Sequence, residues 1–144
     1  KVGFLAGQAC VHAPAMDYTD PYLAIKVAHI MENFQPDLII GSSMGGYVAS
    51  ILARQYGKPA ILFNPAFHNR SFDPSISNFI PNEDDILQDR KIVVLGKNDD
   101  VIPPYITKIM FKNNRNYKIV LEEMGHQTPL NIFIDTINKY KNEL

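Results

Sequence analysis

The sequence has one cysteine, almost no net charge and no long apolar run, and each shortage excludes a class of protein. Cys10 alone among 144 residues excludes an intramolecular disulfide framework and is typical of a reducing cytoplasm, where we expect the protein to reside. A formal net charge of -1 provides no basic field for nucleic acid. No apolar run approaches the roughly 20 residues of a membrane-spanning helix. We therefore expect neither nucleic acid nor a membrane as a partner.

The sequence also contains no motif that is typical of a metal site. No Cys/His cluster has the spacing of zinc ligands, and no acidic loop reads as a calcium site. What is present is 46% hydrophobic residues in a chain long enough for one domain with its own core. We therefore predict a single domain over residues 1–144 that holds no metal.

From residue 36 onward, short apolar runs alternate with longer helical patterns. Strands are predicted over residues 37–41, 59–63, 91–95 and 117–121. Helices are predicted over residues 44–56, 104–111 and 130–140. Strands that are apolar throughout, each followed by a helix, indicate a three-layer α/β fold with a parallel sheet covered by helices on both faces. Such a sheet places its chemistry in the loops at the carboxyl ends of the strands.

The first 35 residues have a less regular pattern. A helix is predicted over residues 22–34, with Asp20 as its cap and Pro21 in its first turn. Residues 10–14 resemble a short strand that ends at a proline. For residues 1–9 we favour a helix, because a strand there would leave no room for a crossover connection before the next strand.

Residues 64–89 form a long excursion rich in Pro, Asn, Ser and Asp. Segments of this kind usually run irregularly near a functional site. We expect this one to cover the site.

Two serines lie between glycines where the first predicted strand meets a helix, in the run GSSMGG of residues 41–46. A P-loop would need a lysine after Gly46, and the dinucleotide fingerprint needs a different glycine spacing, although the bare turn could still bind an anion. The nucleophile elbow, G-x-S-x-G on a strand-to-helix turn, fits better. Only Ser43 satisfies it, with Gly41 and Gly45 two residues away on either side.

An elbow serine needs an acid and a histidine base that follow it in that chain order. His126 comes after the last predicted strand, where a base is expected, whereas His68 precedes any acid loop. Asp99 and Asp100 both follow the third predicted strand and are both candidates for the acid. Each feature alone is usually an ordinary turn, but three of them at successive strand ends, in the required order, favour a catalytic triad.

These residues resemble the α/β-hydrolase superfamily, and within it the small, lidless esterases of the YqiA/YcfP type. The resemblance is carried by GSSMGGY at residues 41–47, NPA at 64–66, the segment 96–103 and Gly125-His126. It implies a minimal α/β-hydrolase fold with Ser43 as nucleophile and His126 as general base. The family's G-x-x-D register implies Asp99 rather than Asp100 as the acid.

The resemblance also implies a chemistry. Ser43 would attack a small carboxylic ester or thioester to form an acyl-enzyme that water then cleaves, without a cofactor. The Met44 amide would be one donor of the oxyanion hole. We expect a small-molecule acyl ester as the substrate, with Asn64, Phe67 and His68 as the substrate-binding candidates. A peptidase or an acyltransferase would use the same triad, and the sequence does not indicate an oligomeric state.

The N-terminus departs from the family pattern. The family begins with a strand whose loop gives the second oxyanion donor, whereas residues 1–6 resemble a later helix. We therefore expect that strand and its loop to be missing from the sequence, the alternative being that residues 4–7 are a degenerate version of the strand end with alanine in place of histidine. An incomplete oxyanion hole is the basis of the alternative hypothesis, a catalytically inactive hydrolase fold that binds a small molecule or a protein partner.

Overall fold

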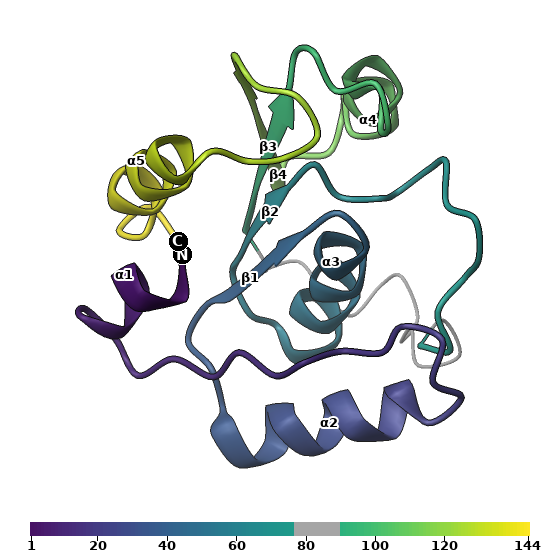
Figure 1. Ribbon diagram of the computed structural model, residues 1–144, viewed down its shortest axis with the longest axis vertical. Helices are drawn as coiled ribbons and strands as arrows, with labels where there is room; N and C mark the ends of the chain where they lie inside the picture. The colour runs from purple at the N-terminus through teal and green to yellow at the C-terminus, as the bar shows by residue number, and fades with distance from the viewer. Residues whose placement is uncertain (77–89) are drawn as a thin grey trace.

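Four parallel strands form the centre of the structure, a computed structural model that describes residues 1–76 and 90–144 (Figure 1). The strands are β1 (Ile39–Ser42), β2 (Ala60–Phe63), β3 (Lys91–Gly96) and β4 (Tyr117–Glu122), and they lie side by side in that order. The helices of the described part are α1 (Val2–Ala6), α2 (Leu23–Phe34), α3 (Met44–Tyr56), α4 (Pro104–Met110) and α5 (Leu130–Tyr140). None of these helices is long and apolar enough to cross a bilayer. From α2 onward, the predicted strands and helices are confirmed with small shifts at their ends.

Successive residues of the central strands pack toward opposite faces of the sheet. Leu62 and Val93 belong to a buried cluster with Ala49 and Ala53 of α3. The neighbouring residues of β2 and β3 pack with α5 instead, in a cluster that includes Phe133. Figure 1 shows α3 and α5 on opposite sides of the sheet. The three-layer α/β arrangement predicted from the sequence is therefore confirmed.

The four strands differ in how deeply they are buried. Every residue of β2 and β3 is buried, whereas β1 and β4 are partly exposed. The sequence pattern suggested four strands that are buried throughout. This was wrong for β1 and β4, because each has only one neighbour in the described sheet and so keeps part of its surface open.

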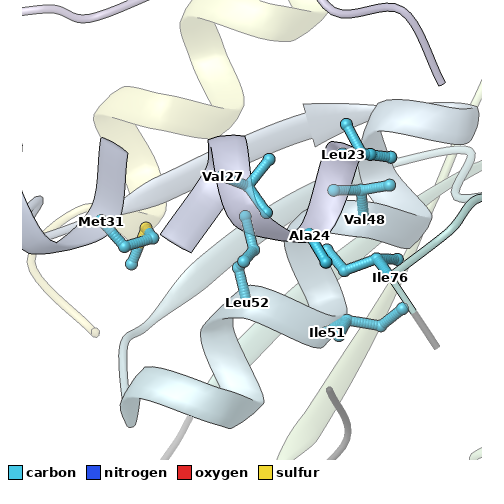
Figure 2. Close-up of a cluster of buried hydrophobic side chains, with 8 residues drawn as sticks. All are labelled: Leu23, Ala24, Val27, Met31, Val48, Ile51, Leu52 and Ile76. Carbon is cyan, nitrogen blue, oxygen red and sulfur yellow. The ribbon is translucent and has the colours of Figure 1, made fainter. Parts of the chain in front are cut away.

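Helix α2 packs on α3 through one apolar face (Figure 2). Leu23, Val27 and Met31 recur every fourth residue and are at most 5% exposed. Their partners on α3 include Val48 and Leu52. Burying an aliphatic side chain of this size contributes about 1.5–3 kcal/mol, so each of these residues stabilises the contact between α2 and α3.

The N-terminal segment contains one confirmed prediction and one correction. Helix α1 lies within residues 1–9, as predicted. The strand predicted over residues 10–14 is wrong, because this stretch is irregular chain leading toward α2 (Figure 1). Four of its five residues are exposed, and Pro14 has no N–H to donate to a neighbouring strand. Because most of this segment is exposed, little burial of apolar surface favours a strand here.

The excursion after β2 can be followed in part. Residues 64–76 contain neither helix nor strand, as predicted. The remainder of the predicted covering segment, residues 77–89, lies outside the described residues. Its position over the site therefore stays a prediction.

Strand β1 and helix α3 approach each other more closely than side chains normally permit. A Cβ on Gly41 would lie 2.3 Å from the carbonyl oxygen of Gly45 and 2.8 Å from the Cβ of Ala49. A Cβ on Gly46 would meet Pro65 at 3.0 Å. The obstructing atoms at Gly41 are mainly backbone, so a side chain there would require α3 to move.

We predict that Gly41→Ala destabilises the protein by about 3 kcal/mol, the upper part of the range for overpacking a close contact. The matched control is Gly3→Ala in α1, where an added Cβ meets nothing within 4 Å. That change should leave stability unchanged or raise it by up to about 1 kcal/mol, because alanine favours helix. Urea denaturation followed by circular dichroism measures both. Equal midpoints for Gly41→Ala and the wild type would contradict the close-approach argument.

Candidate active site

Ser43 occupies the sharp turn between β1 and α3. Its φ of 54° and ψ of -123° lie outside the regions that non-glycine residues favour, which costs of order 1–3 kcal/mol. The turn is held through the backbone, because the Ser43 N–H donates to Phe63 O at 2.9 Å and Ser43 O accepts from the Ala66 N–H at 3.0 Å. Although Ser43 stands at the N-cap position of α3, its hydroxyl makes no capping bond. The hydroxyl is therefore available to another partner.

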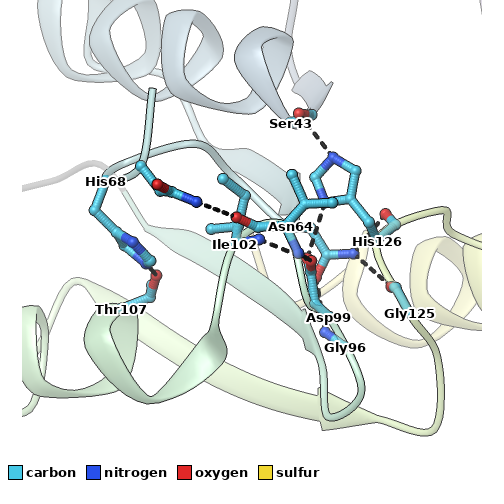
Figure 3. Close-up of polar contacts among 11 residues, drawn as sticks. Ser43, Asn64, His68, Gly96, Asp99, Ile102, Thr107, Gly125 and His126 are labelled. Atoms are coloured by element: carbon cyan, nitrogen blue, oxygen red, sulfur yellow. Dashed lines mark hydrogen bonds and ion pairs between the residues drawn. The ribbon is translucent and has the colours of Figure 1, made fainter. Parts of the chain in front are cut away.

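That partner is His126, in the loop after β4. His126 Nε2 lies 3.0 Å from Ser43 Oγ, and His126 Nδ1 lies 2.9 Å from Asp99 Oδ2 (Figure 3). Because a carboxylate can only accept, Nδ1 carries the proton and the Nε2 lone pair faces the serine hydroxyl. Ser43, His126 and Asp99 thus form one continuous hydrogen-bonded chain from the carboxyl ends of β1, β4 and β3.

The carboxylate in this chain belongs to Asp99, whose side chain is 0% exposed. Its Oδ1 accepts hydrogen bonds from the N–H groups of Val101 at 2.9 Å and Ile102 at 2.8 Å, which leaves Oδ2 for His126. Asp100 is exposed. Of the two candidates, the structure therefore brings Asp99 and not Asp100 to the histidine.

Asn64 has a different environment from the one expected of a substrate-binding residue. It is 1% exposed, with a positive φ of 42°. Its amide donates to Gly125 O at 3.0 Å and His126 O at 2.8 Å, while Oδ1 accepts from the Gly96 N–H at 2.7 Å. Both donors and the acceptor are thus engaged inside the protein, and a role of Asn64 in substrate binding stays a prediction. Its partners lie 32 to 62 positions along the chain, which local sequence patterns do not reach.

Phe67 and His68 lie on the same loop, on its α4 side. Phe67 contacts the rings of Tyr47 at 6.5 Å and Phe111 at 4.8 Å between centroids. His68 Nε2 lies 3.2 Å from Thr107 Oγ1, and Figure 3 shows its ring directed toward Thr107 on α4. These contacts tie the loop to α3 and α4. A role of either residue in substrate binding stays a prediction.

Met44 is the first residue of α3 and directly follows Ser43. The first N–H groups of a helix have no intrahelical acceptor, and the helix dipole places partial positive charge at that end. An anion that forms at Ser43 would therefore meet a favourable electrostatic environment. As for metals, no group of three or more His, Cys, Asp and Glu side chains that could hold an ion occurs within residues 1–76 and 90–144.

The environment of His68 generates a prediction about pH. Burial lowers the pKa of His68 below its ordinary value of 6.5, although a hydrogen bond to the Pro103 carbonyl acts the other way. The unfolded chain then binds a proton at His68 more readily than the folded chain, so stability is lost as pH falls below about 6.5. We predict that His68→Gln reduces this loss between about pH 7 and pH 5. Urea denaturation at each pH measures it.

The comparison variant is His29→Gln, which makes the same chemical change at an exposed position on α2. If His68→Gln and the wild type lose stability in parallel over that interval, the argument from burial is wrong.

Solved structures share this fold. An α/β serine hydrolase homologue from Coxiella burnetii aligns over 96% of this chain and 65% of its own, with 16% identity and a TM-score of 0.59. A predicted CIB-like hydrolase from Thermoplasma acidophilum aligns over 92% and 66%, with 19% identity and a TM-score of 0.57. An α/β-hydrolase enzyme from the sediment metagenome of the Mar Chica lagoon, Morocco, aligns over 84% and 69%, with 11% identity and a TM-score of 0.60. The chain thus has the α/β-hydrolase fold and spans about two thirds of the length of these structures.

Sequence comparison identifies the family. No curated protein is significantly similar to this chain. Residues 11–85, slightly more than half of the chain, match the model of an uncharacterised protein family, UPF0227. The matched stretch contains the Ser43 turn and the NPA tripeptide, which are the more specific part of the resemblance described above. The chain therefore belongs to the UPF0227 family, the family of the YqiA/YcfP type.

Proposed function

We propose that the protein is a serine hydrolase that cleaves small carboxylic esters or thioesters. The observation that carries this proposal is the hydrogen-bonded chain from Ser43 Oγ through His126 to the buried carboxylate of Asp99. The strained backbone at Ser43 adds support, because a turn of this kind presents a nucleophile above the sheet. The α/β-hydrolase fold adds support by analogy, since this fold also holds such chemistry in other proteins.

The geometry supports a two-step reaction. Ser43 Oγ attacks the acyl carbon while His126 Nε2 takes the hydroxyl proton, and the tetrahedral intermediate then expels an alcohol or thiol that receives this proton. In the second step, His126 Nε2 removes a proton from water while the water oxygen attacks the acyl carbon. The second tetrahedral intermediate then breaks its bond to Ser43 Oγ, which takes the proton back from His126, and a carboxylic acid is released. Asp99 keeps Nδ1 protonated throughout and stabilises the imidazolium that forms in each step.

The negative oxygen of each tetrahedral intermediate would form beside the start of α3. The Met44 N–H is the donor that we assign to it, supported by its position directly after the nucleophile. The chemistry requires no cofactor, because the three side chains supply nucleophile, base and orienting acid. The loop that begins at residue 64 leaves β2 beside these side chains, which supports a role for residues 64–89 in shaping the acyl site of this single domain.

We predict that Ser43→Ala abolishes hydrolysis of short-chain p-nitrophenyl esters, with a loss of at least about 1,000-fold in kcat/KM. Ser42→Ala is the matched control, since Ser42 is the adjacent serine but ends β1 and is exposed. It should retain activity. Labelling with a fluorophosphonate probe gives a second readout, in which wild type and Ser42→Ala react and Ser43→Ala does not.

Equal hydrolysis by wild type and Ser43→Ala would contradict the proposal. A wild type that neither hydrolyses esters nor reacts with the probe would favour the alternative, a catalytically inactive hydrolase fold that binds a small molecule or a protein partner.

The acid can be tested separately. We predict that Asp99→Asn lowers kcat by roughly 10,000-fold, because an amide can donate to Nδ1 and so favours the wrong imidazole tautomer. Asp100→Asn makes the same chemical change at the neighbouring exposed position and should retain wild-type kcat within about threefold. Steady-state kinetics on one p-nitrophenyl ester compares the two. Similar losses in both variants would contradict the assignment of Asp99.

A further inference from the structure

We propose that Asn64 is a positioning residue that holds the acid loop and the base loop in register with the nucleophile. The inference rests on the proposed function, because the side chains to be positioned are those of the triad. It gives a role in that function to a residue whose side chain hydrogen-bonds the backbone of the acid and base loops.

The first observation is where the Asn64 amide bonds. Its two N–H groups donate to the carbonyl oxygens of Gly125 and His126, so they fix the backbone that carries the base. Its oxygen accepts from the N–H of Gly96, the last residue of β3. Gly96 O in turn accepts from the Asp99 N–H at 3.2 Å. One amide group therefore bonds the start of the acid turn and the backbone that carries the base.

The second observation is how closely those two loops approach. A Cβ on Gly96 would lie 2.5 Å from Met124 O and 2.6 Å from Gly125 O, so the loops meet backbone to backbone. The Asn98 N–H also donates to Met124 O at 3.1 Å. At such short range, a small rotation of either loop moves the His126 ring relative to Asp99. The Asn64 amide lies across this contact and bonds both sides of it.

The third observation links Asn64 to the nucleophile. The residue before it, Phe63, accepts a hydrogen bond from the Ser43 N–H, and Ala66 donates to Ser43 O. The segment 63–66 thus contacts the turn of the nucleophile through its backbone and the other two loops through the Asn64 side chain. All three loops that carry the triad are therefore hydrogen-bonded to the same short segment, residues 63–66.

The chemistry of the position selects asparagine. The side chain must donate twice and accept once, and aspartate supplies only acceptors. The positive φ also suits asparagine better than most side chains. At 1% exposure, water has no access to replace a lost partner, so the carbonyl oxygens of the base loop would stay unpaired or shift.

The test compares Asn64→Asp, which keeps the shape but loses both donors, with Asn64→Gly, which keeps the positive φ but loses the side chain. Asn33→Asp is the matched control, since Asn33 also donates from its amide to a backbone carbonyl, that of His29, but lies exposed on α2. Steady-state kinetics is run at a temperature where circular dichroism shows each variant folded. We expect kcat to fall about 100-fold in both Asn64 variants, the cost of a misplacement of about 1 Å, with KM within about twofold. Asn33→Asp should match the wild type.

A spectroscopic readout separates positioning from general stability. The imidazole proton shared between His126 Nδ1 and Asp99 should give a far-downfield proton resonance, assigned by its loss in Asp99→Asn. We expect this resonance to weaken or vanish in the Asn64 variants and to persist in Asn33→Asp.

Two results would overturn the proposal. One is a lower Tm in the Asn64 variants with wild-type kcat per folded molecule and an unchanged resonance, which would make Asn64 a purely structural residue. The other is a raised KM with unchanged kcat, which would return Asn64 to substrate binding. If the wild type proves inactive toward esters and the probe, the proposed function fails separately, and the resonance alone decides whether Asn64 positions His126.

Discussion

The close approach of β1 and α3 is the constraint on which the rest of the site depends. With glycine at position 41, the backbone of Gly45 can lie against the strand, so the helix begins directly after the Ser43 turn. In this turn Ser43 has a positive φ, and its hydroxyl makes no capping bond. A wider turn would place the serine in an ordinary helix cap, with its oxygen occupied by the backbone. The strained backbone at Ser43 therefore accompanies the exposure of its hydroxyl to His126.

The parallel sheet brings the other components to the same edge. Because β1, β3 and β4 all end on one side, the loops that carry Ser43, Asp99 and His126 start near one another. Adjacent strand ends alone do not define hydrogen-bond geometry, since loops can rotate about their anchors. Two further sets of hydrogen bonds restrict this rotation. Backbone N–H groups donate to Asp99 Oδ1, and the buried amide of Asn64 bonds the acid and base loops. The site is thus built as much from backbone contacts as from the three reactive side chains.

Much of this could be predicted from the sequence, and the failures have physical causes. Helix α3 and the strands around it follow from local periodicity, and Ser43 follows from the glycines on either side of it. The false strand over residues 10–14 and the exposed edges of β1 and β4 share one cause, since whether an apolar run is buried depends on neighbours that the run does not contain. The internal hydrogen bonds of Asn64 could not be predicted for the same reason. From the sequence alone, an asparagine that follows a strand is equally suited to hydrogen-bond a ligand or a backbone carbonyl from a distant part of the chain.

The sequence by itself determined the order of strands and helices from residue 22 onward, the glycine spacing around Ser43 and the chain order of Ser43, Asp99 and His126. These properties are local, because a few neighbouring residues set periodicity and turn geometry. Only the tertiary structure decided that Asp99 rather than Asp100 meets His126, and that the Asn64 amide is used inside the protein. Those outcomes depend on groups 27 to 62 positions apart in the chain, and their distances are fixed by how the sheet and its loops pack.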